Sequence, residues 1–202
     1  MLQCVIFDFD QTLVDLKLDD KKILNEIIGV YLKGGLSRET LNKYQDPHVM
    51  IGQISESISS PNINNVQKAV YKKLAECEIR YIDRATIFPT SIKVLEKLKS
   101  RGKKIGIVSS NSINTVKKAS EKFGILSFFD AVLGIEDPGR PKPHSDKILF
   151  CLKMLKCKAY ESILVGDTIE DVSAGKNAGV YTIGVLTGSS NMEKLSSRSN
   201  IE

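Results

Sequence analysis

Residues 4–15 read Cys-Val-Ile-Phe-Asp-Phe-Asp-Gln-Thr-Leu-Val-Asp, and this stretch decides the fold. Its first four residues are apolar and rich in β-formers, which is typical of a strand buried on both faces of a parallel sheet. We expect the strand to end at Asp8, on the edge where open α/β sheets bind their ligands. Side chains alternate along a strand, so a bend at Phe9 is needed to leave Asp8 and Asp10 free for different tasks. On its own, such an acidic pair can also be an ordinary polar loop.

The length of 202 residues favours one core domain with a smaller insert. With 42% hydrophobic and 26% charged residues, the composition is that of an ordinary globular protein. The sequence has no apolar run of transmembrane length, and it enters its first strand without the apolar region of a signal peptide. We therefore expect a cytoplasmic protein that makes no contact with a membrane.

The net charge of +5 raises the question of nucleic-acid binding, because residues 93–104 contain six basic side chains and one Glu. However, Ile92, Leu95 and Leu98 fall on one helical face, so most of these lysines form the solvated side of an amphipathic helix. We therefore do not expect nucleic acid as a partner. A modest excess of positive charge also suits an enzyme that attracts small anions.

The four cysteines lie at positions 4, 77, 151 and 157, without a CxxC spacing and within apolar patterns. This distribution favours buried free thiols over a zinc site or disulfides. Cysteine therefore has no chemical role in this interpretation.

The segment 16–85 departs from the alternation of strands and helices found elsewhere in the chain. Apolar stripes at helical spacing predict four helices here, of which the second runs from Ser37 to Tyr44. We therefore divide the chain into an α/β core domain, residues 1–15 and 86–202, and an all-helical insert.

Small polar residues follow the strand predicted for residues 104–108. They are Ser109, Ser110 and Asn111, at the same edge of the sheet as Asp8. Hydroxyl groups and backbone donors at such a junction can bind a phosphate. The same triplet is also a common helix cap, so by itself it does not decide between the two.

Two further carboxylates follow the buried strand predicted for residues 163–165. Asp167 and Asp171 are four residues apart, so they lie roughly on one side of the helix that begins there. Together with Asp8 and Asp10 they form a cluster of hard oxygen ligands of the kind that holds Mg²⁺. We therefore expect a Mg²⁺ ion to bind among these four carboxylates.

In their order along the chain, these strand ends resemble the motifs of the haloacid dehalogenase superfamily of phosphohydrolases. The first motif of that family is Asp-x-Asp-x-Thr after an apolar strand, and Asp8, Asp10 and Thr12 match it. Gln11 stands where Gly is commonest in relatives, which affects a backbone position and no catalytic group. The resemblance covers the core from residue 2 to about residue 188 and implies a Rossmann-like parallel sheet with an inserted helical cap.

The third motif of the family is a Lys that is usually followed by Pro, and two places in this chain have that shape. One is Arg140-Pro141 and the other is Lys142-Pro143. We choose Lys142, because the next helix begins at the distance that relatives show after their Lys. A compact ammonium also suits a place between a carboxylate and a phosphoryl oxygen.

The resemblance implies a Mg²⁺-dependent phosphatase that forms an aspartyl-phosphate on Asp8. Asp10 would protonate the leaving oxygen and then activate water. Mg²⁺ would be held by the Asp8 carboxylate, the Asp10 carbonyl and Asp167, with Asp171 supporting it directly or through water. The residues implied to bind phosphate are Thr12, Ser109, Ser110, Asn111 and Lys142.

The helical cap is implied to close over the site through linkers near Asp15 and Thr86 and to select the substrate. In relatives, a cap loop that resembles the stretch containing His48, Gly52 and Gln53 meets the substrate, although these residues can equally form a plain helix-helix turn. We expect a small phosphorylated metabolite as substrate, as in the phosphoglycolate phosphatase branch of the family.

Three alternatives remain beside a phosphatase. The first is a transferase like β-phosphoglucomutase, but such mutases use a cap His soon after the first motif, and the first His here is His48. The second is dehalogenation, which the presence of Asp10 argues against. The third is a non-catalytic binding protein, which the intact Asp8, Lys142 and Asp167 argue against. We expect a monomer or a homodimer.

Overall fold

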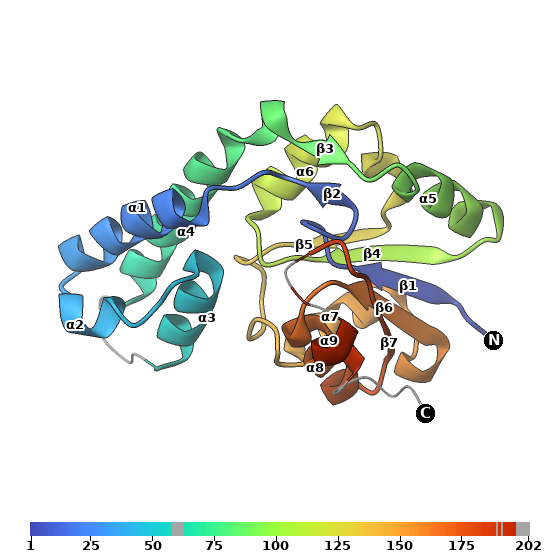
Figure 1. Ribbon diagram of the computed structural model, residues 1–202. Helices are drawn as coiled ribbons and strands as arrows, with labels where there is room; N and C mark the ends of the chain where they lie inside the picture. Colours follow the sequence, from blue (N-terminus) through green and yellow to red (C-terminus); the bar gives the residue numbers. More distant parts are fainter. Residues whose placement is uncertain (58–62, 189, 191, 197–202) are drawn as a thin grey trace.

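The computed structural model describes residues 1–57, 63–188, 190 and 192–196, and a sheet of five strands lies at its centre (Figure 1). β1 is the middle strand and pairs with β4 on one side and β6 on the other. Every pairing in this sheet is parallel, so the carboxyl ends of the strands meet at one edge. The predicted α/β fold is therefore confirmed. In sheet order, the strands are β5 (Ala131–Leu133), β4 (Lys104–Val108), β1 (Cys4–Phe7), β6 (Ser162–Gly166) and β7 (Tyr181–Gly184).

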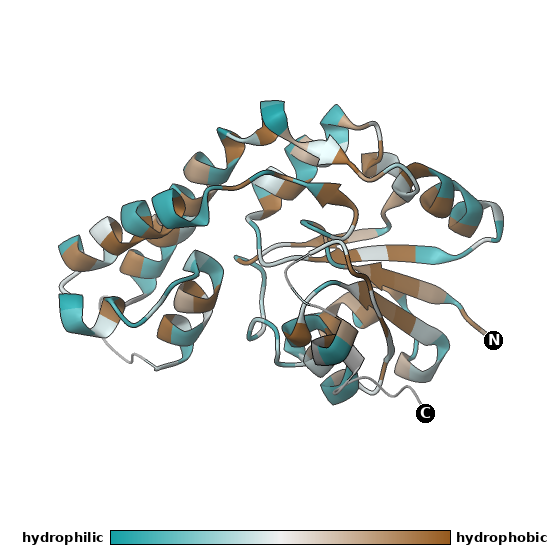
Figure 2. Ribbon diagram, viewed as in Figure 1, coloured by the Kyte–Doolittle hydropathy of each residue, from teal (hydrophilic) through white to brown (hydrophobic). Residues whose placement is uncertain are grey.

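Helices cover both faces of the sheet, because successive side chains of each strand point to opposite sides. Cys4 and Ile6 of β1 pack with apolar residues of α7 and α8. Val5 and Phe7 pack with apolar residues of α5 and α6 on the other face. The central strand β1 and its neighbour β6 are accordingly apolar along most of their length in Figure 2. The helices of the core are α5 (Ser91–Ser100), α6 (Ile113–Lys122), α7 (Asp146–Leu155), α8 (Ile169–Ala178) and α9 (Met192–Ser196).

The first four α-helices after β1 in the described chain form a second lobe beside the sheet (Figure 1). This lobe has its own hydrophobic cluster, which includes Ile27, Ile51 and Leu74. Ile135, from the loop after β5, packs into the same cluster and docks the lobe on the core. We call this lobe the cap; its division from the core at residues 15 and 86 stays a prediction. Its helices are α1 (Asp20–Lys33), α2 (Arg38–Leu41), α3 (Pro47–Ser57) and α4 (Ile63–Ile79).

The second helix of the cap is shorter than predicted. Ser37 caps it, since its side chain accepts a hydrogen bond from the backbone of Thr40 at 3.2 Å. The helix then ends at Leu41 and does not reach Tyr44. Leu41 is the buried residue of this helix, so packing supports a single turn, and short helices are not stable without such packing.

The two chain segments that connect the cap to the core lie side by side. β2 (Val14–Asp15) pairs in antiparallel fashion with β3 (Thr86–Ile87). The chain thus leaves the core and returns to it at one point, where Asp15 faces Thr86. Within the described part of the chain, no helix combines the length and the apolar character that crossing a membrane requires.

Candidate active site

Asp8 and Asp10 lie at the carboxyl end of the central strand. The backbone N–H of Asp8 still donates to the carbonyl of Val165 on β6 at 2.8 Å, so Asp8 continues the sheet. Gln11 then has a positive φ of 61° and reverses the chain. This left-handed backbone explains why Gly is favoured at the position, because a side chain there is strained. The bend is predicted at Phe9; in the structure a turn runs from Phe9, whose carbonyl accepts from the N–H of Leu13 at 2.9 Å, and the left-handed residue of this turn is Gln11, one position after Asp10.

Lys142 bridges two of the predicted carboxylates. Its Nζ donates to Oδ1 of Asp8 at 2.6 Å and to Oδ1 of Asp171 at 2.5 Å. The side chain of Lys142 is 5% exposed, and those of Asp8 and Asp171 are 9% and 0% exposed. Burial lowers the pKa of Lys142, but the charges of Asp171 and Asp8 outweigh burial and raise it, so the ammonium stays charged.

The competing Arg140 lies elsewhere. Its guanidinium donates from Nε to Oδ2 of Asp146 at 2.9 Å and from Nη2 to Oδ1 at 3.0 Å. This bidentate pair at the start of α7 is largely exposed to solvent. Of the two positions with this motif shape, the structure therefore brings Lys142, the residue chosen from the sequence, to Asp8.

Three carboxylates lie close enough together to share one metal ion. Ligand oxygens of Asp8, Asp167 and Asp171 are all within 4.8 Å of one another. A set made of oxygen atoms alone fits Mg²⁺. The carboxylate of Asp10 is not in this cluster, and the role implied for Asp10 at the metal uses its backbone carbonyl.

The two carboxylates from β6 and α8 have different surroundings. Asp171 accepts from Lys142 through Oδ1 and from the N–H and hydroxyl of Thr168 through Oδ2, at 3.1 and 2.5 Å. Both of its oxygens thus already have protein donors, and Asp171 orients the ammonium of Lys142. Asp167 accepts from the hydroxyl of Thr12 at 3.1 Å. Burial and the charge of Asp171 raise the pKa of Asp167 to about 6.

Asp10 has the surroundings of an acid that can exchange its proton near neutral pH. Its Oδ1 accepts from the backbone N–H of Leu16 at 2.8 Å and of Gln11 at 3.1 Å. Burial raises the pKa of Asp10 to about 7, although the bond from Leu16 and the charge of His48 lower it. A carboxyl group with this pKa suits general acid and base catalysis.

Of the three polar residues that follow β4, two line the cavity and one does not. Ser110 and Asn111 line the cavity above Asp8. Ser109 is buried, and its hydroxyl donates to Oδ1 of Asn111 at 2.9 Å. The hydroxyl of Thr12 likewise contacts Asp167, as described above, and neither Thr12 nor Ser109 is among the residues that line the cavity. Their implied contacts with phosphate stay predictions.

The cavity at this edge has a volume of about 700 Å³ and lies between the cap and the core. His48, Gly52 and Gln53 of α3 line it, and their contact with a substrate stays a prediction. Gly52 also meets the core, because a Cβ atom on it would lie 2.9 Å from Cγ of Pro141. The absence of a side chain at Gly52 therefore lets α3 approach the loop that carries Lys142.

Residues 5–185 match the haloacid dehalogenase-like hydrolase family. This match spans all the strand ends that form the site. The chain belongs to this family. The predicted resemblance is confirmed, and so is the expectation that this protein is an enzyme of the hydrolase class.

Curated relatives of this hydrolase have phosphatase names. The chain is 30% identical to the pyrophosphatase PpaX of Bacillus velezensis, over 90% of this chain and 82% of that protein. It is 26% identical to the phosphoglycolate phosphatase of Psychrobacter arcticus, over 92% and 84% of the two chains. A hydrolase from Pseudomonas syringae has the same fold with a TM-score of 0.73 at 20% identity, over 98% of this chain and 90% of that one.

Glu78 is a residue of this hydrolase that the sequence did not indicate as part of the site. It lies on α4 with a side chain that is 0% exposed, and it receives hydrogen bonds from both lobes. Its carboxylate pairs with Nε2 of His48 at 2.9 Å and accepts from Nδ2 of Asn111 at 3.0 Å and the N–H of Ser112 at 2.9 Å. A charged residue four positions after the buried Leu74, inside an apolar helical stripe, was the available signal.

Two glycines let the chain of this hydrolase pass close to its carboxylates. A Cβ atom on Gly188, after β7, would lie 1.7 Å from Oδ2 of Asp167. A Cβ atom on Gly166 would lie 2.3 Å from Cγ of Asp171. Any side chain at either position would displace a carboxylate. The sequence showed Gly166 directly before Asp167, but nothing in it connected Gly188 to the site.

Proposed function

We propose that this hydrolase is a Mg²⁺-dependent phosphatase that cleaves a small phosphomonoester through an aspartyl-phosphate on Asp8. The observation that carries the proposal is the position of Lys142, whose ammonium lies 2.6 Å from Asp8 beside the cluster of Asp167 and Asp171. An anionic nucleophile can approach an anionic phosphoryl group where fixed positive charge offsets their repulsion.

In the first step, an oxygen of Asp8 attacks phosphorus and the bond from phosphorus to the ester oxygen breaks. Asp10 donates its proton to the leaving oxygen, so the product leaves as a neutral alcohol. Lys142 remains between Asp8 and Asp171 and stabilises the charge that gathers on the phosphoryl oxygens. Splitting one difficult displacement into two lowers each barrier.

In the second step, water attacks the same phosphorus atom and the bond to the Asp8 oxygen breaks. Asp10, now ionised, accepts the proton of the attacking water. Inorganic phosphate leaves, and Asp8 and Asp10 return to their starting states. The raised pKa of Asp10, about 7, suits a group that must give a proton and then take one.

Asp8 and Asp167, two members of the carboxylate cluster, would hold Mg²⁺. Oδ1 of Asp167 accepts a hydrogen bond from Thr12, and this bond leaves Oδ2 of Asp167 for the ion. Bound there, the ion would supply positive charge next to the phosphoryl group. Asp171, with both oxygens engaged by Lys142 and Thr168, would support the site from behind.

The contacts of His48 favour water over a sugar hydroxyl as the acceptor. Burial lowers the pKa of His48, but its bond to Glu78 and that carboxylate's charge outweigh burial and raise the pKa to about 9. A protonated imidazole cannot take a proton from an incoming hydroxyl group. This supports the hydrolase over the transferase like β-phosphoglucomutase.

The names of the relatives offer pyrophosphate and phosphoglycolate as substrates to test first. The general proposal does not depend on either. We also propose that the enzyme works in the cytoplasm on a soluble metabolite, as a monomer or a homodimer.

Phosphate release from a panel of phosphomonoesters tests the proposal. We expect turnover with Mg²⁺, loss of turnover in excess chelator, and recovery when Mg²⁺ is restored. Asp8→Asn should abolish turnover, while Asp83→Asn, at an Asp of the short helix at residues 82–84 that does not line the cavity, should not. Undiminished release by Asp8→Asn or in chelator would refute the proposal.

A further inference from the structure

The cavity between cap and core is lined by more carboxylates than the proposed catalysis uses. Besides the catalytic carboxylates, it is lined by Asp20, Asp46, Glu56 and Glu170. The first three belong to the cap side, at the start of α1 and at the two ends of α3. The cavity lining therefore holds four carboxylates in addition to those of the candidate active site, and two of them, Asp46 and Glu56, lie close to His48 and His144.

Every basic side chain that lines this cavity, within the described residues, already has a carboxylate partner. Lys142 is held by Asp8 and Asp171. His48 lies 2.9 Å from Glu78 through Nε2 and 3.8 Å from Asp46 through Nδ1.

The third basic residue that lines the cavity is His144, and it also has a carboxylate partner, because its Nε2 lies 3.2 Å from Glu56. Arg140 borders a neighbouring hollow, where Asp146 holds it through two hydrogen bonds. In the proposed mechanism, Lys142 binds the phosphoryl group. The described part of the cavity lining therefore has no unpaired cation that could bind a second anionic group of the substrate.

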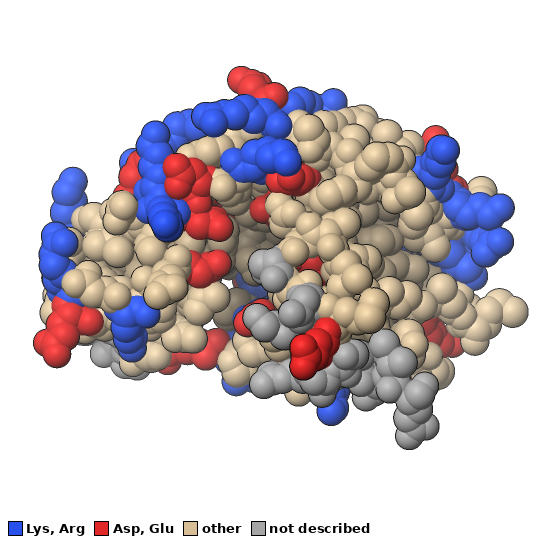
Figure 3. All heavy atoms as spheres, viewed as in Figure 1, with Lys and Arg blue, Asp and Glu red and all other residues tan. Residues whose placement is uncertain are grey.

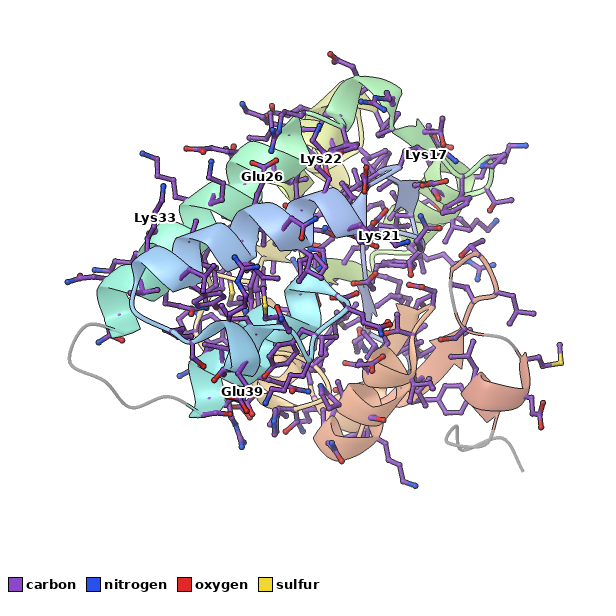
Figure 4. The ribbon with its side chains drawn as sticks, turned by 60° about the vertical axis from the view of Figure 1, so that its left-hand side comes forward. Lys17, Lys21, Lys22, Glu26, Lys33 and Glu39 are labelled. Atoms are coloured by element: carbon purple, nitrogen blue, oxygen red, sulfur yellow. The ribbon has the colours of Figure 1, made fainter. Side chains whose placement is uncertain are left out.

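None of the other basic residues described in the cap lines the cavity. Figure 4 labels Lys21, Lys22 and Lys33 on α1; all three are exposed, and none of them lines the cavity. Figure 3 shows acidic atoms beside the hollow between the lobes and basic atoms mainly along the upper and outer surface. The positive net charge of the protein is therefore not directed at its substrate.

The geometry points to a substrate whose leaving group carries hydrogen-bond donors and no negative charge, namely a hydroxylated or an ammonium-bearing phosphomonoester. This inference rests on the proposed phosphatase and narrows its substrate class. Carboxylates accept hydrogen bonds from hydroxyl and ammonium groups but repel a second carboxylate or phosphate. Phosphoglycolate and pyrophosphate, the substrates in the relatives' names, both carry such a second anionic group.

A matched series of two-carbon esters tests the inference. Phosphoglycolate, 2-hydroxyethyl phosphate and 2-aminoethyl phosphate differ in their terminal group, which is a carboxylate, a hydroxyl or an ammonium. We expect kcat/KM for phosphoglycolate to be lower than for the other two by roughly tenfold or more, because like charges in a partly enclosed site discriminate strongly. The order of the other two distinguishes a hydroxylated from a cationic substrate.

Two substitutions at Glu56 distinguish the effect of the charge at this position from the effect of losing its ion pair with His144. Glu56→Gln and Glu56→Lys both lose the ion pair with His144, but the second also places a cation at the cavity. We expect the preference against phosphoglycolate to shrink in Glu56→Gln and to shrink further in Glu56→Lys. Glu39→Lys makes the same change of charge at an exposed residue of α2, labelled in Figure 4, that does not line the cavity, and it should leave the preference unchanged.

Binding keeps this test independent of turnover. Calorimetry with Asp8→Asn, the variant expected to abolish turnover, and Mg²⁺ gives Kd for the same three esters without their cleavage. Equal or tighter binding of phosphoglycolate, or a preference that Glu56→Lys does not change, would overturn the inference. If no ester is cleaved by the wild type but 2-hydroxyethyl or 2-aminoethyl phosphate still binds more tightly, the phosphatase proposal fails and the inference about the cavity stands.

Discussion

The Nζ atom of Lys142 lies 2.6 Å from Oδ1 of Asp8, although 133 residues separate the two along the chain. The same ammonium lies 2.5 Å from Asp171, so one cation holds a carboxylate from β1 and another from α8. This contact fixes the position of the proposed nucleophile and places positive charge at the proposed phosphoryl site.

Replacing Lys142 should impair chemistry far more than folding. In Lys142→Met we expect kcat to fall by about 10²–10³-fold, the loss typical of removing one donor that stabilises the transition state. Phosphate release in the presence of Mg²⁺ measures the effect, and circular dichroism checks the fold. Lys153→Met, at an exposed position of α7, is the matched control. A kcat within a factor of about two of wild type in Lys142→Met would contradict the role given to this ammonium.

The protonation state of Asp10 should set the alkaline limit of activity. Its pKa is raised to about 7, mainly by burial, so the acid form is lost as the pH rises through that value. We expect kcat/KM for an alkyl phosphate to decline above about pH 7. p-Nitrophenyl phosphate, whose leaving group needs no proton, should decline much less.

The same comparison applies to Asp10→Asn. This variant should lose about 10²–10⁴-fold in kcat/KM for the alkyl ester, the range expected for a general acid, and less for p-nitrophenyl phosphate. Equal losses for both esters, at all pH values, are the result that argues against Asp10 as the acid.

A side chain at Gly188 should weaken the metal site. A Cβ atom there would meet Oδ2 of Asp167 at 1.7 Å, so Gly188→Ala must move that carboxylate or its own loop. We expect the Mg²⁺ concentration for half-maximal activity to rise by roughly 10–100-fold, as when the support of a metal ligand is disturbed. Gly29→Ala is the control, because nothing lies within 4 Å of a Cβ atom at that helical position. Unchanged Mg²⁺ dependence in Gly188→Ala would show that this close approach does not position Asp167.

The buried pair of His48 and Glu78 should stabilise the folded protein in a pH-dependent way. The pKa of His48 is raised from 6.5 to about 9 in the folded state, chiefly because Glu78 outweighs the effect of burial. Asp46, Asp20 and Asp10 also face this imidazole. The stabilisation is therefore complete below pH 6.5 and is lost as the pH rises through about 9.

Thermal unfolding of the wild type and of His48→Gln at several pH values measures this effect. The pH dependence that comes from all other titrating groups is common to both proteins and cancels in the difference between their Tm values. We expect the difference to be larger at pH 6 than at pH 10. His144→Gln should show a much smaller difference, since its pair with Glu56 is partly exposed and such pairs contribute about 0–1 kcal/mol. A difference for His48→Gln that does not vary with pH would rule out the ion pair as its source.

Local patterns in the sequence were enough to predict the core of the fold. The apolar run at residues 4–7 formed β1, and the strand predicted at residues 104–108 has those bounds in the structure. Alternating burial and short apolar runs are properties of the segments themselves, so they can be read without knowing the partners. α2 was predicted too long, because its helical pattern continued past the one residue that packing holds, Leu41.

The sequence by itself determined which residues stand at the strand ends, and with them the candidate nucleophile, acid and metal ligands. It favoured Lys142 over Arg140 by the distance to the next helix, although both occur in the same motif shape. The contacts with Asp8 and Asp146, which separate the two residues in space, came from the tertiary structure. Glu78 came from the tertiary structure alone, since a carboxylate on a buried helical face shows its role only when its donors arrive from other elements. The charge of the cavity also came from the tertiary structure alone, because it depends on which carboxylates and basic side chains pair across the two lobes. The order of residues in the sequence does not show which side chains will pair in space.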